Sequence, residues 1–241
     1  MTLRTTKPFV QSLCTSKLGE EPENCEDVVR IGGGDEELRI ALSDGASTAS
    51  FSAEWANRVA NWYVSRSHHP DGDALLRMAP ALGKGWRRSV SSRPLPWHAE
   101  EKMQGGSFAT LLGVTVSESH WRAIAIGDTC LFHVRDGSIC AAFPYTTSEE
   151  FGARPTLVWT GPSTPAFAGG IREAEGDLEP ADVFVAATDG FAQWLLASVE
   201  QHRQPWDVFK DGPTAVRELV DGERAARRMR NDDVACAWFT V

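Results

Sequence analysis

Short apolar strands that begin or end at an aspartate recur along this 241-residue chain. Residues 28–31 and 38–42 have the composition of strands, and the glycine-rich connection between them is typical of a hairpin. Asp27 precedes the first strand and Asp44 follows the second. Because the start of one strand of an antiparallel hairpin lies beside the end of the next, we expect Asp27 and Asp44 at the same sheet edge.

A second hairpin follows the same pattern. Residues 109–116 and 121–126 are strand-like, and a polar turn separates them. Asp128 comes directly after the second of these strands, so we expect its carboxylate at a strand end as well. A third strand is predicted at 131–134, and it ends at the turn Asp136-Gly137.

The C-terminal part repeats the arrangement a third time. Residues 183–188 form an apolar run that leads into Asp189, whereas Asp232 precedes the apolar run at 234–241. If these two strands are antiparallel neighbours, Asp189 and Asp232 also share one sheet edge.

Helical periodicity fills the intervals between these strands. Trp55, Val59 and Trp62 follow the spacing of one helix face. Strands alternate with helical segments without a regular βαβ rhythm, which favours an α+β fold. The length suits one domain spanning residues 1–241. Helices are predicted at 52–64, 191–199 and 214–229, with a weaker pattern at 73–90, and an irregular insertion at about 143–180.

The composition excludes several classes of protein. The formal net charge of -9 disfavours binding to nucleic acid and to anionic membranes. Apolar runs are shorter than a membrane helix requires, and the N-terminus lacks the apolar core of a signal peptide, so we expect a cytoplasmic protein. The five cysteines have no spacing that indicates a disulfide framework or a zinc site.

The aspartates at strand ends indicate a particular chemistry. Several carboxylates gathered at one edge repel one another unless a divalent cation neutralises them. Hard oxygen ligands suit Mg²⁺ or Mn²⁺. Two such ions bind the oxygens of a phosphate ester and activate a water for in-line attack. The pattern therefore predicts phosphate-ester hydrolysis without a covalent phosphoenzyme.

Six short motifs, five of which contain these acidic residues, follow one another along the chain. They are Glu26-Asp27, Ala41-Leu-Ser-Asp44-Gly45, Gly106-Ser-Phe-Ala-Thr110, Ala125-Ile-Gly-Asp128-Thr129, Ala186-Ala-Thr-Asp189-Gly190 and Asn231-Asp232-Asp233. In this order they resemble the motifs of the metal-dependent protein phosphatase 2C family. The resemblance spans residues 25–241 and implies a four-layer αββα sandwich, in which two antiparallel β-sheets are flanked by helices. It implies a protein serine/threonine phosphatase of the bacterial PPM type, which acts in signalling on phosphoserine and phosphothreonine.

The resemblance also implies a role for each acidic position around two Mn²⁺ or Mg²⁺ ions. Asp44 would bridge both ions and, with Asp189, act in catalysis through the metal-activated water. The Gly45 carbonyl would help to hold one ion, and Asp128 a weaker third. Asp27, Asp189 and Asp232 would complete the ligand set, with Glu26 assisting through water. The 143–180 insertion corresponds to a flap that shapes substrate choice, and the implied partner is a phosphorylated protein, such as a cognate Ser/Thr kinase or its targets.

One position departs from the family pattern. Relatives place an arginine that binds the substrate phosphate four residues before the Glu-Asp pair, and this chain has Pro22 there. Lys17 or Arg30 are candidate substitutes without the matched spacing. The departure leaves open an alternative function, a regulatory binding module on the phosphatase fold that recognises a kinase or phosphoprotein and turns over slowly or not at all.

Two other patterns have less weight. Ser107 lies in a sequence close to a nucleophile elbow, with Asp189 and His202 following in the order of an α/β-hydrolase triad. The elbow needs a helix after the serine, whereas residues 110–116 are strand-like. A basic patch late in the chain is interpreted as a solvated helix face, with docking of an acidic or phosphorylated partner as the alternative; it comprises Arg224, Arg227, Arg228 and Arg230.

Overall fold

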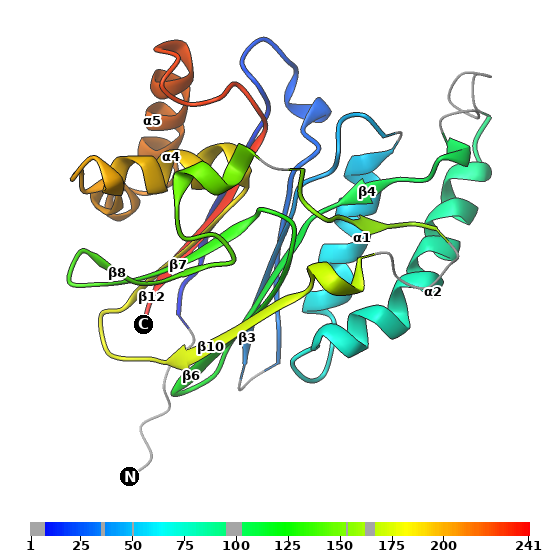
Figure 1. Ribbon diagram of the computed structural model, residues 1–241, viewed down its shortest axis with the longest axis horizontal. Coiled ribbons are helices and arrows are strands. Elements are labelled where there is room, and N and C mark those ends of the chain that lie inside the picture. The colour runs from blue at the N-terminus through cyan, green and yellow to red at the C-terminus, as the bar shows by residue number, and fades with distance from the viewer. Residues whose placement is uncertain (1–7, 35–36, 50, 95–102, 153, 162–166) are drawn as a thin grey trace.

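Two five-stranded antiparallel sheets form the centre of the computed structural model (Figure 1). The structure describes residues 8–34, 37–49, 51–94, 103–152, 154–161 and 167–241. The first sheet has the order β10-β6-β5-β3-β2, and the second has the order β1-β12-β11-β7-β8. Together with a two-stranded pair, β4 (Phe108–Ala109) and β9 (Val158–Trp159), these strands account for the sheet structure of the described ranges.

The first sheet contains both predicted N-terminal hairpins. Its strands are β2 (Val28–Gly32), β3 (Leu38–Ser43), β5 (Leu111–Val116), β6 (His120–Ile126) and β10 (Arg172–Asp177). Val28 pairs with Ser43, and Leu111 pairs with Ile126. The predicted pairing of residues 28–31 with 38–42 is therefore confirmed, and so is that of residues 111–116 with 121–126. The predicted strand 109–116 is shorter than expected at its start, because Ala109 pairs with Val158 instead.

The second sheet joins both ends of the chain. Its strands are β1 (Gln11–Thr15), β7 (Cys130–Arg135), β8 (Ser138–Phe143), β11 (Val183–Ala187) and β12 (Val234–Thr240). Ala187 of β11 pairs with Cys236 of β12, so the two C-terminal strands are antiparallel neighbours as predicted. β12 lies between β11 and β1, which brings the N-terminal residues next to the end of the chain.

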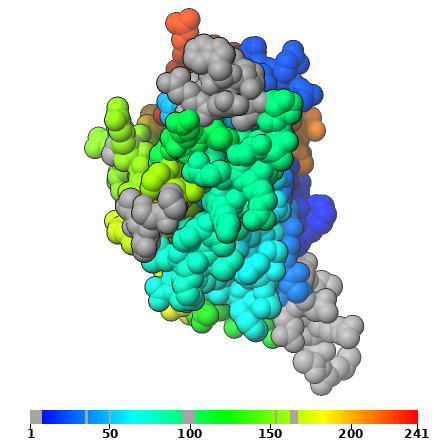
Figure 2. Space-filling model, turned by 90° about the vertical axis from the view of Figure 1, so that its right-hand side faces the viewer, coloured from blue at the N-terminus to red at the C-terminus, as the bar shows by residue number. Residues whose placement is uncertain are grey.

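Helices cover the outer face of each sheet. The helices α1 (Ser52–Val64) and α2 (Gly72–Ser91) pack over the first sheet, and Figure 2 shows the face that α2 covers. On the opposite side of the molecule, α4 (Asp189–Glu200) and α5 (Pro213–Ala225) pack over the second sheet (Figure 1). A third apolar cluster lies between the sheets and includes Leu42, Val114 and Phe184. The predicted αββα sandwich is confirmed.

The helix predictions differ from the structure mainly at the ends. α1 has the predicted bounds, and α2 exceeds its prediction by one residue at each end. α5 ends at Ala225, although the periodicity extended to 229. Arg227 has a positive φ of 57°, and the amide of Arg228 donates to the carbonyl of Glu223 at 2.9 Å. This left-handed turn closes the helix before the apolar Met229 enters the core.

The segment 143–180, which we expected to be irregular, contains the regular edge strand β10. The sequence of β10, Arg-Glu-Ala-Glu-Gly-Asp, exposes charged residues and has too few apolar positions to display a strand pattern. The rest of the segment consists of β9 (Val158–Trp159), the short 3-10 helices η2 (Ser148–Gly152) and η3 (Ala168–Gly170), and connections, with positions 153 and 162–166 outside the described residues. In the part of the chain described here, no helix is long and apolar enough to cross a membrane.

Candidate functional site

The strand pairings place the predicted acidic residues at one end of the sandwich. Asp27 and Asp44 flank the paired residues Val28 and Ser43, so both lie at the same end of the β2–β3 hairpin. The amide of Gly45 donates to the carbonyl of Glu26 at 3.3 Å and extends this pairing by one step. The register of the hairpin thus brings the first two carboxylates together.

Asp27 is the most deeply buried of these carboxylates, with 5% of its surface exposed. Its Oδ2 atom is buried and has no hydrogen-bond partner among the described residues. Burial, followed by the negative charge of Asp44, raises the pKa of Asp27 well above its usual value. An unneutralised carboxylate in this position destabilises the fold unless a cation compensates it.

Asp44 is held in place through its backbone. Its amide donates to the Thr110 hydroxyl at 2.8 Å, and this hydroxyl lies 2.7 Å from the Thr129 hydroxyl. These bonds link Asp44 to the turn that carries Asp128. Burial and the charges of Asp128 and Asp232 raise the pKa of Asp44 to about 7. Burial also raises the pKa of Asp128.

Gly45 is required by the close approach of α1. A Cβ atom at this position would lie 2.8 Å from the carbonyl carbon of Ser52 and 2.9 Å from its oxygen. These are backbone atoms that cannot move away cheaply. The absence of a side chain therefore lets the α1 terminus approach the Asp44-Gly45 turn.

Asp189 and Asp232 meet at one edge, as predicted, and Arg230 bridges them. Arg230 Nη2 forms an ion pair with Asp189 Oδ2, and Arg230 Nε lies 3.3 Å from Asp232 Oδ2. Lys17 Nζ lies 3.3 Å from the other oxygen of Asp232. Two cations thus reach the acidic cluster from opposite ends of the chain.

Glu26 turns toward the start of α1. Its Oε1 atom accepts a hydrogen bond from the Ser52 hydroxyl. The neighbouring amide of Glu26 donates to Asp233 Oδ2 at 2.8 Å, and the amide of Lys17 donates to Asp233 Oδ1 at 3.0 Å. Asp233, which has no assigned role from the sequence, thereby ties two N-terminal segments to the end of the chain.

The donor set fits a hard divalent cation, although the side chains are not arranged as a closed cage. Among the described residues, no group of three or more His, Cys, Asp or Glu side chains converges closely enough to hold a metal ion. Arg230 and Lys17 engage Asp189 and Asp232, while Ser52 engages Glu26. The buried and unpartnered oxygen of Asp27 and the raised pKa of Asp44 nevertheless show a deficit of positive charge that Mg²⁺ or Mn²⁺ would meet.

The interpretation of the late arginines as a solvated helix face is wrong for Arg224 and Arg230. Arg224 is buried, and it donates to the carbonyl of Ser16 at 3.1 Å and to the carbonyl of Asp232. Arg230 reaches the acidic cluster. Both contacts join residues far apart in sequence, which a helical projection cannot reveal. Arg228 pairs with Glu223 at 2.6 Å on the surface.

The structure separates the three positions considered for phosphate binding. Pro22 begins the exposed 3-10 helix η1 (Pro22–Asn24). Arg30 lies within β2 and donates to the carbonyl of Val29 at 2.7 Å. Lys17 contacts Asp232, so it alone of the two proposed substitutes has a described contact with the cluster.

The nucleophile-elbow pattern lacks its structural context. Ser107 is followed by the short strand β4 (Phe108–Ala109), which pairs with β9, and then by β5. A nucleophile elbow requires a helix directly after the serine. The Ser107 amide instead donates to the Thr160 hydroxyl at 2.9 Å, a contact that holds β4 against β9.

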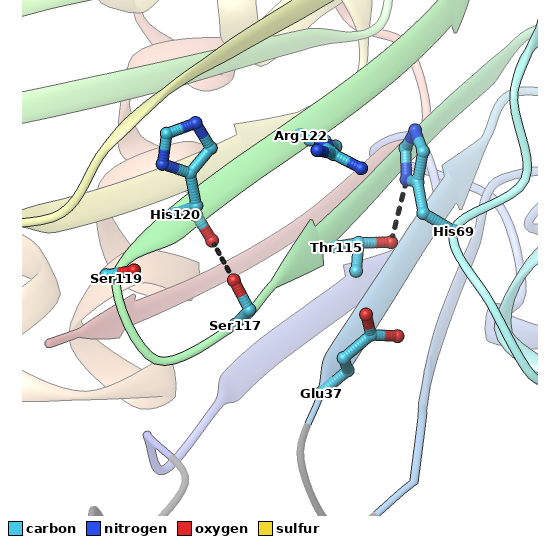
Figure 3. A pocket seen from close by; sticks show the side chains of 7 residues that line it. All are labelled: Glu37, His69, Thr115, Ser117, Ser119, His120 and Arg122. Atoms are coloured by element: carbon cyan, nitrogen blue, oxygen red, sulfur yellow. Dashed lines mark hydrogen bonds between the residues drawn. The ribbon is translucent and has the colours of Figure 1, made fainter.

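A polar hollow of about 430 Å³ lies at the far end of the first sheet (Figure 3). β3 runs from Leu38 near this hollow to Ser43 near the acidic cluster, a span of about 20 Å for its six residues. Two of the side chains that line the hollow already face a carboxylate, because His120 lies 2.9 Å from Asp177 and Arg122 lies 3.3 Å from Glu175. The hollow is lined by Glu37, His69, Thr115, Ser117, Ser119, His120 and Arg122.

Solved structures of several bacterial proteins share this fold. The serine/threonine phosphatase Stp1 from Staphylococcus aureus superposes with a TM-score of 0.68 and 11% identity, covering 98% of this chain and 96% of that one. The S. agalactiae serine/threonine phosphatase has a TM-score of 0.63 and 13% identity, with 97% and 99% covered. PppA, described as a key regulatory component of the T6SS in Pseudomonas aeruginosa, has a TM-score of 0.61 and 16% identity, with 97% and 98% covered.

At these identities the structural likeness shows the fold alone. A search of curated protein sequences found no match. The sequence profile of the family described as protein phosphatase 2C, however, matches residues 20–228, which is most of the 241 residues. The chain therefore belongs to the protein phosphatase 2C family.

Proposed function

We propose that this protein is a metal-dependent protein serine/threonine phosphatase that hydrolyses phosphoserine and phosphothreonine. The observation that carries the proposal is a group of three carboxylates at one end of a phosphatase 2C sandwich, the buried Asp27 and Asp128 and the half-buried Asp44, whose pKa values are all raised. Such a group destabilises the fold unless its charge is compensated, and divalent cations bound by the carboxylates would compensate it.

Two Mn²⁺ or Mg²⁺ ions would be held by Asp44, the Gly45 carbonyl, Asp27, Asp189 and Asp232, with Glu26 acting through water and Asp128 at a weaker third ion. The chemistry that such ions supply when bound is Lewis-acid polarisation of the phosphate ester and activation of water. Thr110 and Thr129 orient the Asp44 turn, and Asp233 fixes the segment that carries Glu26 and Asp27.

Arg230, with Lys17 beside it, supplies the positive charge for the substrate phosphate in this proposal. The Arg230 side chain is 46% exposed, so its guanidinium reaches both the cluster and solvent. A guanidinium binds two oxygens of a phosphate at once, which compensates for Pro22 in the position of the family arginine. The expected partner is a phosphorylated protein in the cytoplasm, either a Ser/Thr kinase or one of its targets.

The ion pairs of Arg230 also favour a second function, a regulatory binding module. Arg230 contacts Asp189 and Asp232, and its positive charge partly replaces that of a metal ion. In this second function Arg230 stays bound to Asp189 and Asp232 in place of a metal ion, and the protein recognises phosphoproteins without hydrolysing them. The similarity to PppA, described as a regulatory component, suits either function.

Hydrolysis of a phosphothreonine peptide tests the two functions. The purified protein is assayed with Mn²⁺, with Mg²⁺ and with EDTA, beside Asp189→Asn and Asp44→Asn. Turnover that requires metal and disappears in both variants supports the phosphatase. Full activity in either variant contradicts the assigned site. Phosphopeptide binding without turnover, in a protein that takes up no Mn²⁺ by calorimetry, favours the binding module.

A further inference from the structure

Two cysteines lie in contact beside the acidic cluster. Cys14 is an exposed residue of β1, and Cys25 is a half-buried residue directly after η1. Their Sγ atoms are 3.2 Å apart. Both sulfurs also lie near the carbonyl oxygen of Asp27, at 3.2 Å from Cys14 and 3.6 Å from Cys25.

The surrounding hydrogen bonds hold this contact in place. Cys14 pairs with Ala235 in the ladder between β1 and β12, which fixes one sulfur. The amide of Cys25 donates to the carbonyl of Pro22 at 3.3 Å. The two segments are also joined through Asp233, whose carboxylate accepts bonds from the amides of Lys17 and Glu26. The proximity of the two sulfurs thus follows from the fold rather than from two free side chains.

The other three cysteines lack this arrangement. Cys130 and Cys236 are fully buried in the cluster between the second sheet and its helices, where reagents cannot reach them. Cys140 is exposed on β8, and the described residues give its sulfur no cysteine neighbour. Cys140 therefore serves as an internal reference for a solvent-accessible thiol outside a pair.

We propose that Cys14 and Cys25 form a thiol–disulfide modification site that takes low-molecular-weight disulfides such as glutathione disulfide. The exposed Cys14 sulfur attacks one sulfur of the reagent, breaks its S–S bond and releases the first glutathione. Cys25 then attacks the Cys14 sulfur, and the second glutathione leaves. The protein loses two electrons and two protons, and the reagent gains both to become two thiols.

The geometry suits the second step in particular. The sulfurs must approach from 3.2 Å to about 2.0 Å, and no strand needs to change its pairing partner for this movement. The bond would link β1 to the residue before Glu26 and Asp27. If the proposed phosphatase function is right, this link also changes the position of Asp27, because both sulfurs now contact its carbonyl.

The test measures which thiols disappear together. The fully reduced protein is incubated with glutathione disulfide, denatured, alkylated and analysed by peptide mass spectrometry. We expect a cross-linked pair of peptides containing Cys14 and Cys25, with both thiols lost at one rate, while Cys140 acquires only glutathione. In Cys25→Ser, Cys14 should retain glutathione as a stable mixed disulfide, and Cys140→Ser should leave the cross-link unchanged.

Two results would overturn the proposal. In the first, the wild-type protein keeps glutathione on Cys14 and forms no bond between Cys14 and Cys25. In the second, Cys14 and Cys25 remain reduced, and are therefore alkylated, after Cys140 has already reacted with glutathione disulfide. The wild-type time course answers the question even if Cys25→Ser does not fold. The disulfide is detected by mass and the phosphatase by metal-dependent hydrolysis, so failure of one proposal is distinguishable from failure of the other.

Discussion

Two buried aspartates of this protein meet opposite electrostatic conditions. Asp182 is 0% exposed, and its oxygens lie 2.7 and 2.8 Å from nitrogens of Arg135 and 2.8 Å from Nε2 of His133. Arg135 holds the pKa of Asp182 well below its usual range. The described residues form no ion pair with Asp27, and burial moves its pKa in the other direction. The charge of Asp182 is therefore compensated within the fold, whereas that of Asp27 is the one that the proposed metal ions would compensate.

Asp182→Asn should therefore destabilise the protein by about 2 to 4 kcal/mol near neutral pH, because it removes a charged partner from Arg135. The folded-state pKa of Asp182 lies below the unfolded one. Its contribution is therefore present above the unfolded value of about 3.9 and is lost as the pH falls toward the folded value. Urea unfolding of both proteins should show a large difference at about pH 7 and a smaller one at about pH 3.

Asp177→Asn is the matched control for this prediction. Asp177 also faces a histidine, at 2.9 Å from His120, but its side chain is 85% exposed. Solvent screens such a pair, so its loss should change stability little at either pH. An equal loss of stability for Asp182→Asn at both pH values would contradict the role given to the Asp182 charge.

Arg230→Ala should raise the KM for a phosphothreonine peptide by about tenfold or more, because it removes the charge-assisted bonds that Arg230 is proposed to make to the phosphate. It should also increase the affinity for Mn²⁺ measured by calorimetry, since the guanidinium no longer competes for Asp189 and Asp232. Arg228→Ala is the control, because Arg228 pairs with Glu223 away from the cluster. Unchanged KM and unchanged Mn²⁺ affinity in Arg230→Ala would contradict both effects.

At the scale of elements, the docking of α2 depends on a glycine. A Cβ atom on Gly83 would lie 2.3 Å from the carbonyl oxygen of Thr160, directly after β9. Gly85 lies on the same helix, and its Cβ would meet only the end of the flexible Arg58 side chain, at 3.0 Å. The packing of α2 against the Thr160 backbone therefore excludes a side chain at Gly83 but not at Gly85.

Gly83→Ala should destabilise the protein by about 1 to 3 kcal/mol, because the helix or the Thr160 backbone must move. Gly85→Ala should stabilise it by about 0.5 to 1 kcal/mol, because alanine is the better helix former. Urea unfolding of the two variants gives both values. If both variants changed the free energy of unfolding by the same amount and in the same direction, the approach of α2 to β9 would not depend on the absence of a side chain at Gly83.

The elements that sequence could predict are those with local signals. Both N-terminal hairpins and α1 follow from apolar pattern and turn residues within short windows. β10 was missed because an edge strand with Glu173, Glu175 and Asp177 has no apolar alternation. The end of α5 was missed because a left-handed residue that is not glycine, Arg227, closes it.

At the scale of the whole molecule, the candidate site joins distant parts of the chain. The paired aspartates were predictable, since antiparallel register places them at one edge. The contacts of Arg230 and Asp233 were not predictable. Arg230 reaches Asp189 because β11 pairs with β12, and Asp233 meets the amides of Lys17 and Glu26 because β1 pairs with β12. The bond from the Glu26 amide to Asp233 spans 207 positions of sequence. No local pattern carries that information.

The same assembly predicts how metal affects global stability. Carboxylates gathered at the site exist as a group only in the folded chain, so Mn²⁺ should bind the folded state and raise the melting temperature. At a concentration one hundred times Kd, the gain is about 2.7 kcal/mol, or roughly 5 to 10 °C for a domain of this size. Differential scanning fluorimetry with Mn²⁺ and with EDTA measures the shift.

Asp27→Asn separates this metal effect from general stabilisation. It should raise the melting temperature measured without metal and reduce the shift that Mn²⁺ causes. Without metal, the variant should melt at a higher temperature than the wild type, since it removes a buried charge whose Oδ2 has no partner in the described residues. With Mn²⁺, the melting temperature of the variant should rise little, since one of the proposed ligands is lost. Asp177→Asn, far from the cluster, should keep the wild-type shift. A full Mn²⁺ shift in Asp27→Asn would mean that the ion binds elsewhere, and the burial of Asp27 would then need another explanation.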